Sequence, residues 1–156
     1  MFADQQSIMQ LTNEYIRGLV DGEGCFTFTT SKYKTRSGIV TQKIPAFAIG
    51  MHERDLALIE SVRDHLKLKN KVYVHKSFVG DGHKRGDKAF LIVREIGNLK
   101  NVIVPFFYKK LRGHKAFQFE NWIMKIGSEP TVPPGFKLIH RLYMSGYWDR
   151  NPKYID

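Results

Sequence analysis

The chain has 156 residues and is 42% hydrophobic, which is enough for one domain with a proper core and too short for two comfortable ones. It carries 25 lysines and arginines against 15 acidic residues, so its formal charge is +10 and a polyanionic partner, nucleic acid first, is expected. No apolar run approaches the ~20 residues of a membrane-crossing helix, and the cations do not stripe one long amphipathic helix, so we expect a soluble protein and no membrane partner.

The first predicted element is a helix that begins near Thr12. Threonine is a common N-cap residue, and Leu11, Tyr15 and Leu19 recur at the spacing of one helix face. A helix is therefore expected over residues 12–20 and into the segment that follows.

The end of this helix has an unusual composition. Asp21 and Glu23 lie among Gly18, Gly22 and Gly24, although glycine costs a helix interior roughly 1 kcal/mol relative to alanine. One interpretation is that the glycines end the helix and the acids are solvated turn residues. The other is that small residues let two helices pack closely, while an acid at the helix end binds Mg²⁺ beside a phosphodiester.

Two hairpins are predicted, each of them after a helix. Residues 25–31 alternate with period two, residues 32–43 form a polar, basic connection with a mobile tip, and residues 44–51 return as a strand. The later elements are a helix over 53–66, a strand over 71–79, a glycine-rich basic turn over 80–87 and a strand over 88–96.

The last third of the chain is predicted to be helical. One helix begins at Asn98 and is limited or kinked by Pro105, and another covers 113–126. A proline-rich segment over 127–136 should be irregular, and residues 137–149 can form a short closing helix. We therefore expect an α+β core over residues 1–127, with a linker and a short helical tail over 128–156.

Two hairpins with helices on one face leave the other face open. By alternation and turn position, this face is predicted to carry Thr27, Thr29, Ser31, Tyr33, Arg36, Gln42, Tyr73, His75, Ser77, Lys84, Arg85, Lys88 and Arg94. Such a surface can read base edges in a major groove while its basic turns contact phosphates. An ordinary solvated polar face is the alternative, and the charge of +10 favours binding.

The segment IRGLVDGEG, residues 16–24, resembles the nine-residue signature of the LAGLIDADG homing endonucleases. Gly18, Leu19, Asp21 and Gly24 are identical to it, and Glu23 is a conservative change. The order αββαββα over about the first 126 residues is similar to the same family. The resemblance implies an α+β fold in which helices cover one face of a saddle-shaped antiparallel sheet.

The resemblance also implies a function. This chain has one signature, as in the homodimeric branch, so it is expected to be an intron-encoded, homodimeric endonuclease that cuts double-stranded DNA at a near-palindromic target with Mg²⁺ or Mn²⁺. Glu23 would hold the metal, with the Gly22 carbonyl as an additional ligand. The helix pair would be formed by Gly18, Leu19, Asp21 and Gly22, with Asp21 capping or bracing the helix interface.

Two features depart from the family pattern or leave its residues unassigned. Met51 occupies the place of a glutamine that positions solvent, so either another polar group such as His52 substitutes or activity is altered. A basic residue near the last core helix helps to polarise the solvent in this family, and Lys110, Arg112 and Lys115 are the candidates here. The alternative function is a catalytically inactive RNA maturase or DNA-binding regulator with the same fold.

The single cysteine, Cys25, excludes an internal disulfide and argues against a structural zinc site. It fits a reducing compartment, either a prokaryotic cytoplasm or an organelle matrix or stroma.

Overall fold

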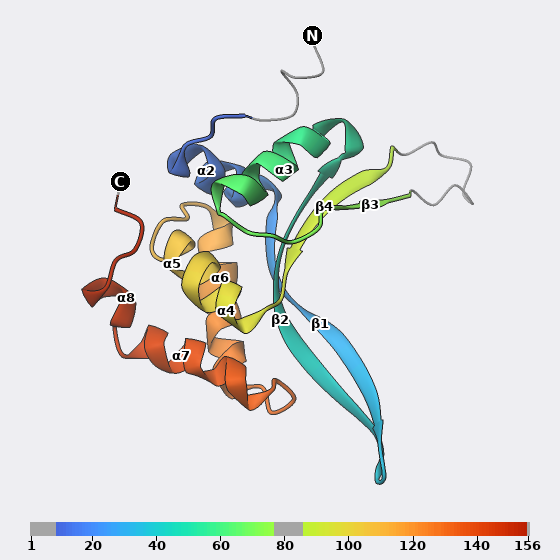
Figure 1. Cartoon of the computed structure of the whole chain (residues 1–156). Helices are drawn as coiled ribbons and strands as arrows, with labels where there is room; N and C mark the ends of the chain where they lie inside the picture. The colour runs from blue at the N-terminus through green and yellow to red at the C-terminus, as the bar shows by residue number, and fades with distance from the viewer. Residues whose placement is uncertain (1–8, 77–85, 156) are drawn as a thin grey trace.

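The structure is a computed structural model that describes residues 9–76 and 86–155 (Figure 1). Its helices and strands follow one another as α2 (Asn13–Glu23), β1 (Gly24–Thr35), β2 (Gly38–His52), a 3-10 turn (Glu53–Asp55), α3 (Leu56–His65), β3 (Tyr73–His75), β4 (Lys88–Val93), α4 (Ile96–Asn98), a π-helical segment (Leu99–Ile103), α5 (Val104–Phe107), α6 (His114–Ser128), a 3-10 turn (Pro134–Phe136), α7 (Lys137–Met144) and α8 (Tyr147–Arg150). The predicted order of helices and hairpins is confirmed.

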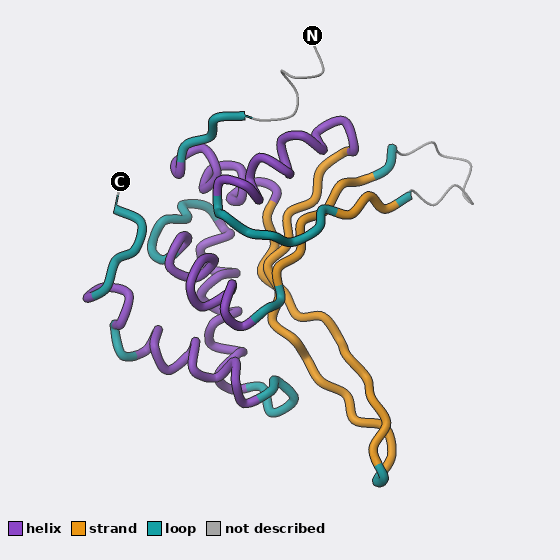
Figure 2. The backbone as a smooth tube through the Cα atoms, viewed as in Figure 1, coloured by secondary structure: helices purple, strands orange, loops and turns teal. Residues whose placement is uncertain are grey.

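The four strands form one antiparallel sheet in the order β1-β2-β4-β3. The sheet curls, and the helices gather on one side of it, while the other side is open in the part of the chain described (Figures 1 and 2). The predicted α+β fold, with a curved antiparallel sheet and helices on one face, is confirmed.

Helix α2 begins as its sequence predicts, because the Thr12 hydroxyl accepts a hydrogen bond from the Tyr15 backbone N–H (3.1 Å). The buried side of the helix carries Ile16, Arg17 and Val20, and Arg17 lies over the Phe106 ring of α5. The predicted stripe is mixed, because Tyr15 is 48% exposed whereas Leu11 and Leu19 are partly buried and pack against the core cluster. Periodicity identified the helix correctly, but it did not show which side faces the core.

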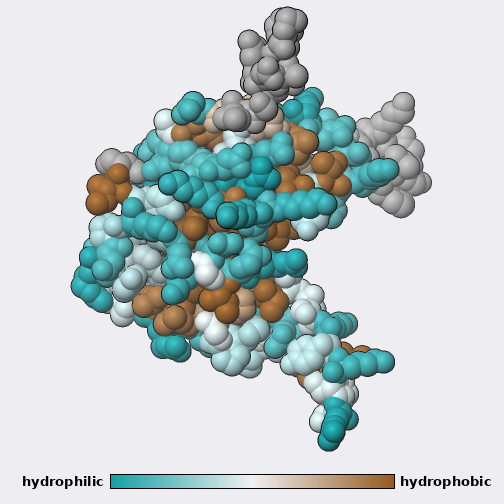
Figure 3. Space-filling view, in the orientation of Figure 1, coloured by the Kyte–Doolittle hydropathy of each residue, from teal (hydrophilic) through white to brown (hydrophobic). Residues whose placement is uncertain are grey.

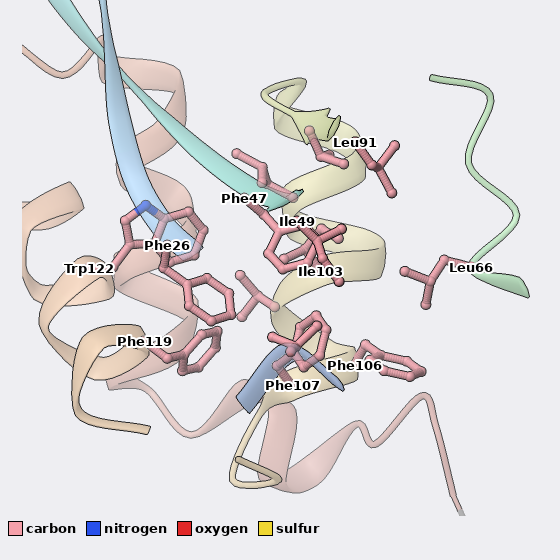
Figure 4. Packing of buried hydrophobic residues seen from close by; sticks show 14 of the residues in the cluster. Phe26, Phe47, Ile49, Leu66, Leu91, Ile103, Phe106, Phe107, Phe119 and Trp122 are labelled. Carbon is pink, nitrogen blue, oxygen red and sulfur yellow. The ribbon is translucent and has the colours of Figure 1, made fainter. Parts of the chain in front are cut away.

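The core is built around aromatic rings between the sheet and the helices (Figure 4). The ring of Phe26 on β1 packs against four others, at centroid distances of 5.4 Å to Phe47, 5.8 Å to Phe107, 4.9 Å to Phe119 and 5.3 Å to Trp122. The Trp122 indole N–H also donates to the Thr27 carbonyl (2.8 Å), which fixes α6 to β1. Residues from both hairpins and from α6 therefore share one core.

The chain passes from α2 to β1 without a loop, and Gly24 makes this possible. The Gly24 N–H donates to the Val20 carbonyl, and a Cβ at position 24 would lie 2.5 Å from Val20 Cγ1 and 2.9 Å from Val20 O. The close approach requires the missing side chain, so Gly24 is a packing requirement of the junction.

Gly24→Ala is expected to lower the free energy of unfolding by about 1–3 kcal/mol, the usual cost of forcing a methyl group into a packed site. Urea denaturation measures this change. Gly97→Ala is the matched control, because a Cβ at Gly97 would contact nothing within 4 Å in the described residues. An equal loss of stability in both variants would contradict this role of Gly24.

The predicted hairpin is confirmed, but its polar connection over residues 32–43 is mostly strand. Strands β1 and β2 continue through it and pair up to Thr35 and Gly38, leaving a two-residue turn. Gly38 has a φ of 122°, which a residue without a side chain adopts freely. Polar side chains do not prevent a strand, because the backbone ladder continues regardless of their polarity. We call the part of this hairpin over residues 30–43 the arm.

The second hairpin and the third helix also differ in detail from the sequence prediction. Strand β3 is short, and the predicted basic turn falls largely on residues 77–85, outside the described residues. The helix begins at Ile96 rather than at Asn98. Pro105 has no N–H to offer the Asn101 carbonyl four residues earlier, and that carbonyl instead accepts a hydrogen bond from Lys153 Nζ. A π-helical segment precedes Pro105.

The described residues 128–155 pack onto the helices of the core. Four side chains of this tail belong to the buried hydrophobic cluster: Val132, Phe136, Ile139 and Trp148. The tail is thus continuous with the core in packing, although it lies at the end of the chain.

Candidate functional site

Glu23 is the last residue of α2 and directly precedes the first residue of β1. It is exposed, as is its neighbour Gly22. The buried anchors Val20 and Gly24 lie on either side of the pair, so the Glu23 carboxylate is presented from a fixed backbone. A carboxylate and a backbone carbonyl in this setting form a donor set that Mg²⁺ accepts.

Asp21 connects α2 to the start of α6. Its carboxylate accepts hydrogen bonds from the backbone N–H groups of Arg112 (3.0 Å) and Gly113 (3.1 Å). Gly113 is the N-cap position of α6, where backbone donors and the helix dipole favour an anion. Asp21 and Glu23 therefore have different surroundings, and Asp21 is used within the chain.

The outward side of α2 carries small and apolar residues. A Cβ at Gly18 or at Gly22 would contact nothing within 4 Å in the described part of the chain. Tyr15 is exposed and Leu19 is half-buried on the same helix. This side can accept another helix at close range.

Among the cations predicted near α6, Arg112 pairs with a carboxylate other than Glu23. The Arg112 side chain is 81% exposed, and its guanidinium pairs with Glu14 (2.7 Å), in the first turn of α2. Glu14 is nine residues before Glu23, or ~13 Å along the helix. Lys110 is exposed and Lys115 lies half-buried in the first turn of α6. The pairing of Glu14 with Arg112 had no signal in the sequence.

The predicted binding residues follow the open side of the sheet. Register places Thr27, Thr29, Ser31 and Tyr33 on one side of β1, with Ala46, Ile44, Gln42 and Val40 as their partners on β2. Lys88 on β4 pairs with His75 on β3, and Tyr73 pairs with Phe90, all on the same side as the β1 row. Arg36 is at the arm's tip and Arg94 is just past β4. Ser77, Lys84 and Arg85 lie outside the described residues.

This face is concave and includes Phe90 and Ile92, which were not among the predicted binding residues. The molecular outline is hollowed between the arm and the upper strands (Figure 3). Phe90 covers Gly50, where a Cβ would lie 2.2 Å from the ring, and the His75 ring meets Phe90 edge-on at 5.1 Å. The alternation in KAFLIV could have placed Phe90 and Ile92 here.

A pocket of about 400 Å³ lies at the edge of this face, and three cations line it: Lys69, Lys71 and Arg94. Asn70 and Asn98 donate to the Glu95 carboxylate in the same pocket (2.9 Å each). Burial raises the pKa of Glu95, but the hydrogen bonds from the two amides outweigh it and hold that pKa below its usual value. The lysines are signalled by the basic loop LKLKNK.

The sequence profile of the LAGLIDADG endonuclease family matches residues 16–126. The chain belongs to this family. The signature IRGLVDGEG therefore covers most of α2 and its junction with β1, and the match runs to Ile126 of α6.

Solved LAGLIDADG endonucleases have the same fold. The homing endonuclease I-TnaI is 27% identical, with a TM-score of 0.57 and 88% of each chain covered. Meganuclease I-SmaMI bound to uncleavable DNA is 23% identical, with a TM-score of 0.59. I-CpaMI bound to uncleaved DNA is 20% identical, also with a TM-score of 0.59. A comparison with curated proteins gave no match.

The coverage differs among these LAGLIDADG structures. The match to I-SmaMI covers 88% of this chain but 44% of that chain, and the match to I-CpaMI covers 90% and 43%. This chain therefore spans less than half the length of either meganuclease.

Met51, at the place where the resemblance implies a glutamine, lies in apolar surroundings. It pairs with the buried Ala89 and packs, partly buried, against the hydrophobic cluster. The adjacent His52 points to the other side of the strand, and its Nδ1 accepts a hydrogen bond from the Arg54 N–H (3.1 Å). His52 therefore does not occupy the position of Met51.

Residues 9–76 and 86–155 contain no cluster of three or more His, Cys, Asp or Glu side chains arranged to hold a metal ion. One exposed carboxylate still fits magnesium, which keeps several waters and uses one or two carboxylates together with substrate oxygens. In the same residues, none of the helices is long and apolar enough to cross a bilayer.

Proposed function

We propose that this LAGLIDADG endonuclease acts as a homodimer that cuts both strands of a specific, near-palindromic DNA duplex with Mg²⁺ or Mn²⁺. The observation that carries the proposal is the pairing of two features on one helix. The exposed Glu23 lies at the end of α2, and the outward side of the same helix is open at Gly18 and Gly22. A two-fold axis beside this side would bring two Glu23 carboxylates together.

The proposed helix contact is formed by Gly18, Leu19, Asp21 and Gly22. Asp21 supports this contact indirectly, because its hydrogen bonds to Arg112 and Gly113 fix α2 against α6. The I-SmaMI and I-CpaMI chains have room for a second unit of this size. A second copy of this chain would supply that unit here.

Each Glu23 carboxylate, with the Gly22 carbonyl, would hold a divalent cation. Such a cation would supply a lowered pKa for a water molecule and charge stabilisation at the leaving oxygen of the phosphodiester. Arg112 and Lys115, with Lys110 as a further candidate, would contact the phosphate or polarise the attacking water. For Arg112 this requires release from Glu14, an exposed ion pair of the kind worth about 0–1 kcal/mol.

The open face of the sheet would bind the duplex. The arm and the strands beside it present hydroxyl, amide and aromatic side chains to base edges, and the basic residues around them would contact phosphates. Two copies would carry a formal +20, so affinity should fall steeply with salt. I-SmaMI and I-CpaMI, which share the fold, were crystallised with DNA.

A cleavage selection tests this function. The wild-type protein is incubated with a library of randomised duplexes, and cut molecules are sequenced. We expect two-strand cleavage of near-palindromic sites with Mg²⁺ or Mn²⁺ and none with EDTA. Cleavage that persists in EDTA would refute metal dependence.

The alternative is an RNA maturase or DNA-binding regulator that has lost cleavage. Met51 is the observation that favours it, because a half-buried thioether cannot position a water molecule as an amide does. No cutting with either metal, together with tight RNA binding, would establish the maturase reading. Tight sequence-specific DNA binding without cutting would establish the regulator.

A further inference from the structure

The arm extends beyond the strands that anchor it. Strand β4 pairs with β2 over residues 47–52, whereas β1 and β2 continue to pair as far as the tip. Along the outer part of the arm, residues 31–39 are exposed, and Ile39 is 67% exposed. The orientation of the arm therefore depends on contacts at its base (Figure 2).

The C-terminal tail makes one of these contacts. The Lys43 backbone N–H donates to the Thr131 carbonyl (3.1 Å), past the point where β4 stops pairing with β2. Between these two points lies Pro45, which has no N–H to donate. The Lys43 ammonium also lies 3.7 Å from the Glu129 carboxylate. Thr131 thus takes the place of a neighbouring strand for one residue of the arm.

The turn that presents Thr131 is itself fixed. The Glu129 carboxylate accepts hydrogen bonds from the Thr131 hydroxyl (3.0 Å) and backbone N–H (3.4 Å). These bonds, the hydroxyl first, lower the pKa of Glu129, and Lys43 and Lys137 lower it further. Val132, the next residue, is buried in the core. The turn is therefore anchored on both sides of the carbonyl that holds the arm.

Lys137 anchors the same turn from α7. Its ammonium donates to three backbone carbonyls, those of Ile126 (3.0 Å), Gly127 (3.2 Å) and Glu129 (2.8 Å). These carbonyls lie at the C-terminus of α6, where the helix dipole favours a cation. One side chain thus joins α7, the end of α6 and the turn that contacts the arm.

We propose that residues 129–137 fix the angle of the arm, and that Lys137 is a positioning residue for the reading of the outer base pairs of the DNA target. The reading of base pairs rests on the function proposed above, whereas the fixing of the arm does not. Lys137 would act through Thr131 and Lys43 without touching DNA.

The length of the arm makes its angle important. From Lys43 to Gly38 the strand extends ~17 Å at its usual rise per residue. A rotation of ~10° at the base would move the tip by ~3 Å, close to the spacing of ~3.4 Å between neighbouring base pairs. A small loss of rigidity at the tail turn would therefore shift the tip by about one base pair, while residues near Glu23 would remain in place.

Two measurements test the inference, and one of them needs no DNA. Spin labels at Ile39→Cys and Asn121→Cys, in a Cys25→Ser background, report the distance between the arm and α6 by pulsed electron resonance. The test variants are Lys137→Met and Glu129→Ala. Lys137→Arg keeps a donor for the carbonyls, and Lys153→Met removes a tail lysine that donates to the Asn101 carbonyl, away from the arm.

We expect the label distance distribution to broaden in Lys137→Met and Glu129→Ala, and to match the wild type in Lys137→Arg and Lys153→Met. In a binding selection with Ca²⁺, the first two variants should lose at least about tenfold preference at the outer base pairs and keep it at the central ones. Glu129→Ala keeps the test valid if Lys137→Met does not fold.

Unchanged distances in both test variants would overturn the fixing of the arm. Broadened distances with unchanged outer preference, or an equal loss at outer and central positions, would overturn the role in reading. If the wild type shows no sequence preference at all, the proposed DNA function fails, and the label distances alone decide whether the tail fixes the arm.

Discussion

Glu23→Gln is expected to reduce DNA cleavage by about 10³-fold or more while changing the DNA dissociation constant by less than about threefold. The amide has nearly the same shape but no charge, so the proposed metal site loses an interaction worth several kcal/mol, and each 1.36 kcal/mol is tenfold in rate. Affinity should remain because the proposed phosphate contacts come from the cations of the sheet face and do not include Glu23. Single-turnover cleavage and fluorescence anisotropy with Ca²⁺ measure the two quantities.

The matched control is Glu120→Gln, an exposed glutamate on α6. It removes the same charge from the protein and should leave both quantities unchanged. An equal loss of binding and cleavage in Glu23→Gln would contradict the division of roles between Glu23 and the sheet, and a fully active variant would exclude Glu23 as the metal ligand.

Gly18→Leu is expected to weaken dimerisation by at least about 30-fold without unfolding the subunit. Overpacking costs about 1–3 kcal/mol at each site, and a two-fold contact would carry two of them. Within the subunit, the described residues leave open space at this position, and leucine favours a helix over glycine by nearly 1 kcal/mol. Sedimentation velocity across a concentration series measures the dimer, and urea denaturation measures the subunit.

Gly97→Leu serves as the control, because Gly97 is also helical and a Cβ there also meets nothing within 4 Å among the residues described. It lies in α4, outside the proposed helix contact, and should not alter the dimer. A wild-type protein that sediments as a monomer both with and without DNA would refute the homodimer directly.

Local patterns in the sequence predicted the elements whose signals are local. The N-cap at Thr12, the alternation after Gly24 and the apolar stripe of α6 all correspond to observed elements. Their physical causes act within a few residues: a hydroxyl near a free N–H, or side chains that repeat with the period of the backbone. The family signature added the expectation that the helices cover one face of an antiparallel sheet.

Contacts between distant residues could not be predicted in the same way. Residues 32–43 were predicted as a polar connection of the hairpin, yet the strands pair through them by backbone groups that composition does not report. The stripe of α2 that looked like the core face is only partly buried and leaves Tyr15 exposed, because Ile16 and Val20 occupy the fully buried side of the helix. The Asp21 bonds to Arg112 and Gly113 join residues about ninety positions apart, and periodicity carries no information at that range.

The direct passage from α2 into β1 couples two properties of the molecule. Glu23 and Gly24 are consecutive, and the contact of Gly24 with Val20 leaves the junction little freedom to bend. With the roles proposed here, a wrong base pair that displaces β1 would also displace the carboxylate at its root. Discrimination between targets should then appear more strongly in the rate of strand scission than in the stability of the complex.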